Sequence, residues 1–138
     1  MLVISNDEPI KDMEQETIFG QVVAKANNYM AVPDKEGGRR IIKSDSVRRY
    51  ERNFAMQCRA YRGRKINSPF ILHINVYQSS WRYDLDNSIK TVLDCLQMVG
   101  AITNDNLCTE IRARKGIDRT NPRVVFSIQE TQPRLFNL

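Results

Sequence analysis

The sequence predicts an α+β domain in which a small mixed β-sheet packs against two main helices. Segments with strand-like alternation are interleaved with two segments whose apolar residues recur at helical spacing, in the order strand, helix, strand, helix, strand, strand. The chain has 138 residues, which suits one domain with a single modest core. It contains no internal repeat and no low-complexity segment.

The N-terminal part of the chain predicts one strand and a long loop. Residues 1–15 are polar and acidic without a sustained period, so we expect a flexible tail, with residues 16–138 forming the single domain. Residues 17–24, TIFGQVVA, predict the first strand. Residues 25–43 contain paired asparagines, a proline and paired glycines, and they predict a long loop of the kind that is often functional.

The first helix is expected from Ser44, its N-cap, to a point near Gly63. Its apolar stripe comprises Val47, Tyr50, Phe54, Cys58 and Tyr61, spaced three and four residues apart. Arginines lie largely off this stripe, which predicts an amphipathic helix with a basic outer side.

The second half of the chain predicts three strands and one helix. Pro69 opens the strand FILHINVYQ, which is apolar on both faces and is therefore expected at the centre of the sheet. A helix follows from residue 86 or so, with apolar residues at helical spacing as far as Val99, and Gly100 is its natural end. The strands TEIRARKGI, residues 109–117, and RVVFSIQE, residues 123–130, complete the sheet.

Composition excludes several classes of site. The three cysteines are scattered without a CxxC pair, which argues against a disulfide framework and a zinc site and suits a reducing cytoplasm. The one histidine, His73, lies in a strand and is interpreted as a packed residue, so a Ser-His-Asp triad lacks its parts. No apolar stretch is long enough to cross a bilayer, and the first residues do not resemble a signal peptide.

Basic residues are concentrated in one segment. The net charge is +5, and residues 39–65 contain ten lysines and arginines against two acids. Such an excess is a plausible footprint for a phosphate backbone. A solvated helix face with basic flanks is the alternative, and the charge pattern alone leaves both open.

The stretch WRYDLDNSIK, residues 81–90, has two interpretations. As ordinary structure, Asp86 caps the helix and pairs with Lys90 one turn later, which leaves Asp84 without a structural role. As a metal site, the two aspartates are hard oxygen ligands of the kind Mg²⁺ prefers, and Lys90 offsets charge on a phosphate. Asp105 could join them only if the chain folds back, because a helix of about 13 residues spans roughly 20 Å. The residues alone leave both interpretations open.

The longer run DLDNSIKTVLDCLQMVGAITND, residues 84–105, resembles the signature of the RusA family of Holliday junction resolvases. That signature has the form D-L-D-N-x-x-K, then a helix with a D-x-L pair, a glycine and an acidic turn. The match covers Asp84, Leu85, Asp86, Asn87, Lys90, Asp94, Leu96, Gly100 and Asp105 without a gap. Asn104 departs from it, since family members often carry a second acid there.

The resemblance implies a small homodimeric endonuclease, bacterial or phage-encoded and cytoplasmic, that binds four-way DNA junctions and nicks two strands symmetrically in recombination and repair. It implies Mg²⁺, with Mn²⁺ as a possible substitute, and no small-molecule cofactor. Asp84, Asp86 and Asp105 would bind the metal, and Lys90 would act on phosphate charge. One acidic site per chain agrees with a two-fold dimer making paired cuts.

The expected DNA contacts combine the basic segments with the resemblance, which adds an asparagine-containing loop after the first strand. They are Lys25, Asn27, Asn28, Arg48, Arg49, Arg52, Arg82, Arg112 and Arg114. Two competing hypotheses remain: a non-catalytic architectural module that binds branched DNA, and a flap or fork nuclease with the same metal site.

Overall fold

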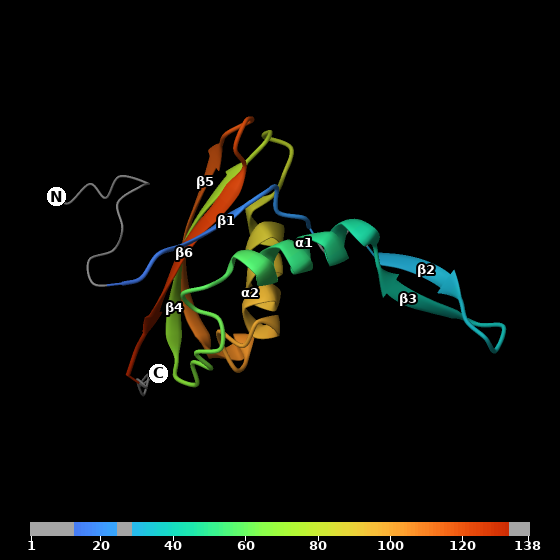
Figure 1. Cartoon of the computed structure of the whole chain (residues 1–138), viewed down its shortest axis with the longest axis horizontal. Coiled ribbons are helices and arrows are strands. Elements are labelled where there is room, and N and C mark those ends of the chain that lie inside the picture. Colours follow the sequence, from blue (N-terminus) through green and yellow to red (C-terminus); the bar gives the residue numbers. More distant parts are fainter. Residues whose placement is uncertain (1–12, 25–28, 133–138) are drawn as a thin grey trace, which may run out of the picture.

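A four-stranded mixed sheet forms the centre of the molecule. The computed structural model describes residues 13–24 and 29–132 (Figure 1). The strand order is β1-β6-β4-β5, with bounds Glu16–Phe19 for β1, Arg123–Glu130 for β6, Phe70–Gln78 for β4 and Cys108–Ile117 for β5. β5 runs parallel to β4, whereas β6 is antiparallel to both β4 and β1. The predicted α+β class and mixed sheet are confirmed.

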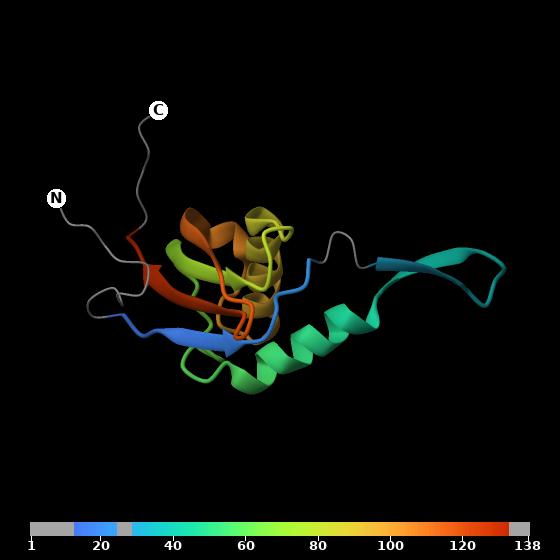
Figure 2. The same cartoon turned by 90° about the horizontal axis from the view of Figure 1, so that it is seen from above.

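Two helices cover one side of this sheet, α1 at Asp45–Gln57 and α2 at Leu85–Met98 (Figures 1 and 2). Alternate residues of β4, from Phe70 to Gln78, are buried on this side and meet the apolar stripes of both helices in one core. α2 connects β4 to its parallel neighbour β5, because two parallel strands require a crossover long enough to return to the same end. None of the described helices is long and apolar enough to span a bilayer.

A β-hairpin occupies part of the predicted loop. β2, Tyr29–Pro33, pairs with β3, Arg39–Lys43, in a separate two-stranded sheet that extends away from the body (Figure 2). The prediction of an unstructured loop over 25–43 was therefore wrong for 29–43. The turn is built locally, because the Asp34 carboxylate accepts from the backbone N of Glu36 at 2.9 Å and of Gly38 at 2.7 Å, and Gly37 takes a positive φ of 83°.

Two element ends differ from the prediction. β1 ends at Phe19 because Gly20 turns the chain with a φ of 117°, so residues 21–24 are not strand. α1 ends at Gln57, well before Gly63, because the buried carboxylate of Glu16 accepts the backbone N–H groups of Arg59 and Ala60, each at 2.7 Å. The predicted bounds of β4 and β6 are confirmed, as is the N-cap of α1 at Ser44, and β5 begins one residue early.

Candidate active site

Two exposed carboxylates lie at the beginning of α2. Asp84, not Asp86, is the N-cap residue, and its side chain makes no capping hydrogen bond to the helix backbone. It accepts instead from Nδ2 of Asn87 at 3.3 Å. Asp86 follows in the first turn, where the helix dipole favours its negative charge. The interpretation of Asp86 as the cap was wrong, and both carboxylates remain accessible to a ligand.

Lys90 links the second turn of α2 to the turn that follows the helix. Its Nζ donates to Oδ1 of Asp94 at 3.0 Å and to Oδ2 of Asp105 at 3.3 Å. Asp105 begins a short 3-10 helix, η2, at Asp105–Leu107. Bonding to Asp94, which outweighs the opposing effect of burial, together with Asp105, raises the pKa of Lys90 above its usual value. Lys90 therefore carries a positive charge at neutral pH.

A polar pocket of about 540 Å³ lies beside this contact and is lined by both of its carboxylates. Its lining comes from β3, α1, α2 and the turn that leads into η2, and comprises Lys43, Glu51, Asp94, Gln97, Met98, Asn104 and Asp105. A second ion pair, Lys43 Nζ to Glu51 Oε2 at 2.9 Å, joins the hairpin to α1 at its edge. Asp105 is held on its backbone side, because its N–H donates to Oε1 of Gln97 at 3.1 Å. Sequence reasoning missed Glu51 and Gln97, which carry no motif signal.

The three predicted metal ligands do not form a ready-made cage in this single chain. Among residues 13–24 and 29–132, no group of three or more histidine, cysteine, aspartate or glutamate side chains is arranged to hold a metal ion. Asp105 is engaged by Lys90, whereas Asp84 and Asp86 stand at the helix start. Two accessible carboxylates still fit Mg²⁺, which commonly takes one or two of them and completes its shell with water and substrate phosphate.

Lys115 holds the segment that leads into Asp84. This residue of β5 donates from Nζ to the backbone oxygen of Trp81 at 2.9 Å and to that of Tyr83. Its ammonium group also lies 5.6 Å from the centre of the Trp81 ring. The segment between β4 and α2 is therefore fastened to β5. In the sequence Lys115 looked like one more base in a basic strand. The available signal was the alternation of that strand, which places Lys115 on the opposite face from Arg112 and Arg114.

The predicted DNA contacts fall on different sides of the molecule. Arg48, Arg49 and Arg52 are exposed on α1. Arg112 and Arg114 pair in register with His73 and Asn75 of β4, so they lie on the sheet face opposite the helices. Lys25, Asn27 and Asn28 lie outside the described residues. Among the expected DNA contacts, Arg82 is exposed near the aspartates.

Arg82 interacts with its neighbour in the chain. Its Nη2 donates to the hydroxyl of Tyr83 at 3.0 Å, which lowers the pKa of Tyr83 and raises that of Arg82. The guanidinium also lies 5.0 Å from the centre of the Tyr83 ring. Arg82 and Tyr83 therefore form one exposed cationic and aromatic unit directly before Asp84.

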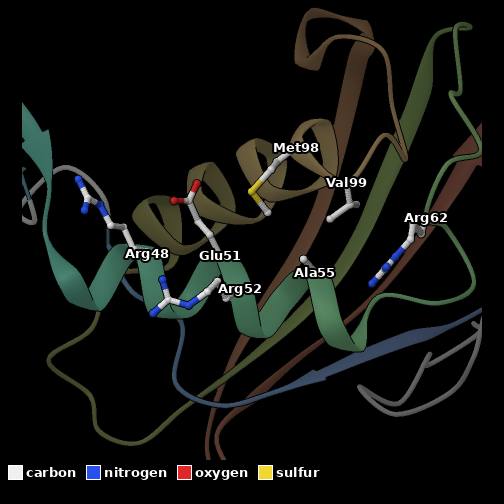
Figure 3. A pocket seen from close by; sticks show the side chains of 7 residues that line it. All are labelled: Arg48, Glu51, Arg52, Ala55, Arg62, Met98 and Val99. Atoms are coloured by element: carbon white, nitrogen blue, oxygen red, sulfur yellow. The ribbon is translucent and has the colours of Figure 1, made fainter.

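A second groove, of about 410 Å³, runs between α1 and α2 (Figure 3). Met98 and Val99 at the end of α2 face Ala55 of α1, and arginines stand at its rim (Figure 3). Its full lining is Arg48, Glu51, Arg52, Ala55, Arg62, Met98 and Val99. Glu51 and Met98 line both hollows, so the basic face of α1 adjoins the pocket that contains Asp105.

Two comparisons with known proteins match most of the chain. The family model described as Endodeoxyribonuclease RusA matches residues 20–129, which include both helices, β4, β5 and all but the last residue of β6. The chain is also similar to the crossover junction endodeoxyribonuclease RusA of Aquifex aeolicus (strain VF5), with 27% identity over 112 residues that cover 80% of this chain and 86% of that protein. The chain therefore belongs to the endodeoxyribonuclease RusA family.

Proposed function

We propose that this chain is a Mg²⁺-dependent endonuclease that resolves Holliday junctions by paired symmetric nicks and acts as a homodimer in DNA recombination and repair. The observation that carries the proposal is the pair of accessible carboxylates, Asp84 and Asp86, at the start of a helix that also presents Lys90 beside Asp105. Family membership and the relative in Aquifex aeolicus, named as a crossover junction endodeoxyribonuclease, support the substrate class.

The roles of the residues follow from their charges. Asp84 and Asp86 would hold the metal, with Asp105 as the third carboxylate once Lys90 shifts toward substrate. When bound, the metal supplies a Lewis acid and a water of lowered pKa that can attack phosphorus. Lys90, kept protonated by Asp94 and Asp105, donates to a phosphate oxygen on which negative charge develops.

The exposed arginines of α1 would hold the DNA backbone on the side of the molecule that contains the polar pocket with Asp105. Arg48 and Arg52 line the groove beside that pocket, so a strand bound along α1 would approach Asp105. Phosphate contacts of this kind set position and affinity but carry no base sequence information.

The homodimer follows from the reaction. Two opposed strands must be cut, and a chain with a single Asp84–Asp86 pair supplies one site. A two-fold dimer facing a two-fold junction supplies two sites in matching orientation. Heterodimers of wild type with an inactive variant should therefore nick one strand of a junction and leave the other intact.

The test uses a labelled four-way junction incubated with the protein and Mg²⁺, with EDTA in a parallel sample. We expect two symmetric nicks and a nicked duplex product that EDTA suppresses. Asp86→Asn should bind the junction with nearly unchanged affinity and fail to cleave it, because the amide keeps the size of the carboxylate but loses its charge.

Asp45→Asn is the matched control, because Asp45 is an exposed acid in the first turn of α1 as Asp86 is in the first turn of α2. It loses the same helix-dipole interaction and should still cleave. Binding that needs no metal and yields no nicks from the wild-type protein would contradict the proposal and favour an architectural DNA-binding module. Cleavage by Asp86→Asn at the wild-type rate would remove the role assigned to that residue.

A further inference from the structure

A row of hydrogen-bonded polar side chains, two of them buried, lies behind the start of α2. Gln78, the last residue of β4, is 0% exposed although its side chain ends in a polar amide. Its Nε2 donates to Oγ of Ser88 at 2.7 Å, and the Ser88 hydroxyl donates to the backbone oxygen of Asp84 at 2.9 Å. Gln21 donates from Nε2 to Oε1 of Gln78 at 2.5 Å. The row therefore ends on the backbone of the residue proposed as a metal ligand.

The chemistry of the groups fixes the direction of this row. The backbone oxygen of Asp84 can only accept, so the single hydroxyl proton of Ser88 points to it. Ser88 must then accept from Gln78, which directs the amide nitrogen of Gln78 to Ser88 and its oxygen to Gln21. Gln21 satisfies its own oxygen by accepting from the backbone N of Ser79 at 2.8 Å. Neither amide can turn over without breaking hydrogen bonds of this row.

A second contact near this row connects α2 to the segment that follows β1. The Thr91 hydroxyl, 1% exposed as a residue, donates to the backbone oxygen of Val23 at 2.7 Å. Gln21 and Val23 therefore connect this segment to β4 and α2. The segment leads toward Asn27 and Asn28, which are expected to contact DNA.

We propose that Gln78, with Gln21 and Ser88, is a positioning residue that fixes the start of α2 and thereby the place of Asp84 and Asp86. This rests on the proposed function, because it assigns a task to the side chains behind the proposed metal ligands. The Asp84 side chain does not cap its own helix, so the contacts from Ser88 and Gln78 hold that turn instead. Side chains that orient metal ligands typically contribute 10–100-fold in metal affinity or activity.

The test compares variants of Gln78 by metal binding and by cleavage. Gln78→Met keeps the length of the side chain and removes both hydrogen bonds, whereas Ser88→Ala removes only the last link. Mn²⁺ affinity, measured from the electron paramagnetic resonance signal of free Mn²⁺, should fall about 10–100-fold in each. The double variant should lose no more than the greater single loss, because both changes break one chain of contacts. Single-turnover cleavage should fall with Mn²⁺ affinity, while junction affinity should stay within about threefold.

Gln129→Met is the matched control. Gln129 lies on β6 and its Oε1 meets Nε2 of His73 at 2.9 Å on the sheet face away from the helices. It should lower the free energy of unfolding and leave Mn²⁺ affinity within about twofold of wild type. If Gln129→Met loses as much stability as Gln78→Met but keeps its Mn²⁺ affinity, the loss of affinity in Gln78→Met comes from positioning and not from general destabilisation.

Each outcome decides the proposal. Wild-type Mn²⁺ affinity in both Gln78→Met and Ser88→Ala would overturn it, as would an equal loss in Gln129→Met, because the row would then serve only the fold. If the wild-type protein binds Mn²⁺ but does not cut a junction, the proposed function fails while the positioning role stands on the binding data. If the wild-type protein binds no Mn²⁺, the metal role of Asp84 and the positioning role both fail.

Discussion

At the scale of single residues, Lys90 is the group whose role the structure changes most. The sequence places it one turn after Asp86, as one member of a charged row along α2. In the structure its ammonium group turns to Asp94 and Asp105, and it thereby joins α2 to η2. A lysine held between two carboxylates is a permanent cation at neutral pH, which suits charge stabilisation and excludes action as a general base there.

Lys90→Met should reduce single-turnover junction cleavage by about 10²–10³-fold, because removal of one charged donor to a developing anion typically costs that much. Junction affinity should change little. In the wild type the pKa of Lys90 is raised. The positive charge is therefore fully present at pH values below the usual pKa of lysine, and it is lost only as the pH rises through the raised pKa. The cleavage rate should therefore not fall through loss of this charge between pH 7 and pH 9. A retained rate in Lys90→Met would contradict the assignment.

The thiol of Cys58 should be unreactive in the folded protein. Burial, with added hydrogen bonding and charge from Glu16, raises the pKa of Cys58 to about 12 from 9.0. Cys108 is only partly buried, so iodoacetamide at pH 8 should label Cys108 first and Cys58 far more slowly. Peptide mass spectrometry with time measures this, and the protein unfolded in urea, in which all three cysteines react, is the control. Rapid labelling of Cys58 in the folded protein would contradict its burial.

The same thiol has a consequence for stability against pH. The folded state disfavours the thiolate, so the contribution of Cys58 is fully present below pH 9 and is lost as pH rises toward about 12. A Cys58→Ala variant, whose unfolding free energy lacks this group, should show a shallower decline over that alkaline range.

At the scale of elements, the end of α1 is set by a residue from another part of the chain. Glu16 of β1 is 8% exposed, and its Oε1 accepts from the backbone N of Arg59 and Ala60. These N–H groups would otherwise extend the helix ladder. Tyr61 continues the helical spacing of the apolar stripe, yet it is buried by other contacts. Its hydroxyl donates to the backbone oxygen of Glu14 and accepts from the backbone N–H of Ile128. The spacing alone could not reveal this break.

Glu16→Ala should lower the free energy of unfolding by about 2–3 kcal/mol, because buried N–H groups lose a charged acceptor. Urea denaturation measures the change. Glu14→Ala is the control: its carboxylate pairs with Arg64 at 2.5 Å, but both side chains are substantially exposed, so the expected loss is about 0–1 kcal/mol. Equal losses in the two variants would refute the role given to Glu16.

Glu14 and Glu16 also mark where the acidic tail expected over residues 1–15 becomes part of the domain. Residues 1–12 lie outside the described structure. Glu14, within the expected tail, contacts Arg64 and Tyr61. The two glutamates stand two positions apart in the sequence, and only their tertiary contacts distinguish the surface ion pair of Glu14 from the buried carboxylate of Glu16.

At the scale of the whole molecule, the sheet separates two groups of basic residues. α1 presents Arg48 and Arg52 on the side that contains the polar pocket with Asp105. Arg112 and Arg114 lie on the opposite face of the sheet. Arg112 also pairs with Glu110 at 3.2 Å. The side that contains the candidate site is therefore the better candidate for the DNA surface.

Exchanging Arg48 and Arg52 together for glutamine should reduce the magnitude of the slope of log K against log salt by about 2, since each phosphate contact contributes about 0.9. The same exchange at Arg112 and Arg114 should reduce it by less than about 1. Fluorescence anisotropy of a labelled junction over a salt series measures both. Arg64→Gln serves as the control, because Arg64 is engaged by Glu14. A larger effect from the β5 pair would place the DNA on the other face.

Local pattern was sufficient for much of the fold. The period-2 alternation of β4 and β6 and the helical stripe of α2 predicted those elements to within a residue or two, because each pattern is complete within its own segment. The hairpin of β2 and β3 was missed, since its signal lies in the turn chemistry of Asp34 and two glycines within a segment of weak alternation.

By itself, the sequence determined which residues can do the chemistry: the spacing of Asp84, Asp86 and Lys90 and the similarity of residues 84–105 to a known family. Only the tertiary structure decided which of them meet. Lys90 contacts Asp105 across 15 positions, Glu16 reaches Arg59 across 43, and Gln21 reaches Gln78 across 57. Such contacts depend on how the sheet and helices pack. A periodicity of two or 3.6 residues says which face a side chain takes, and says nothing of what is brought against that face.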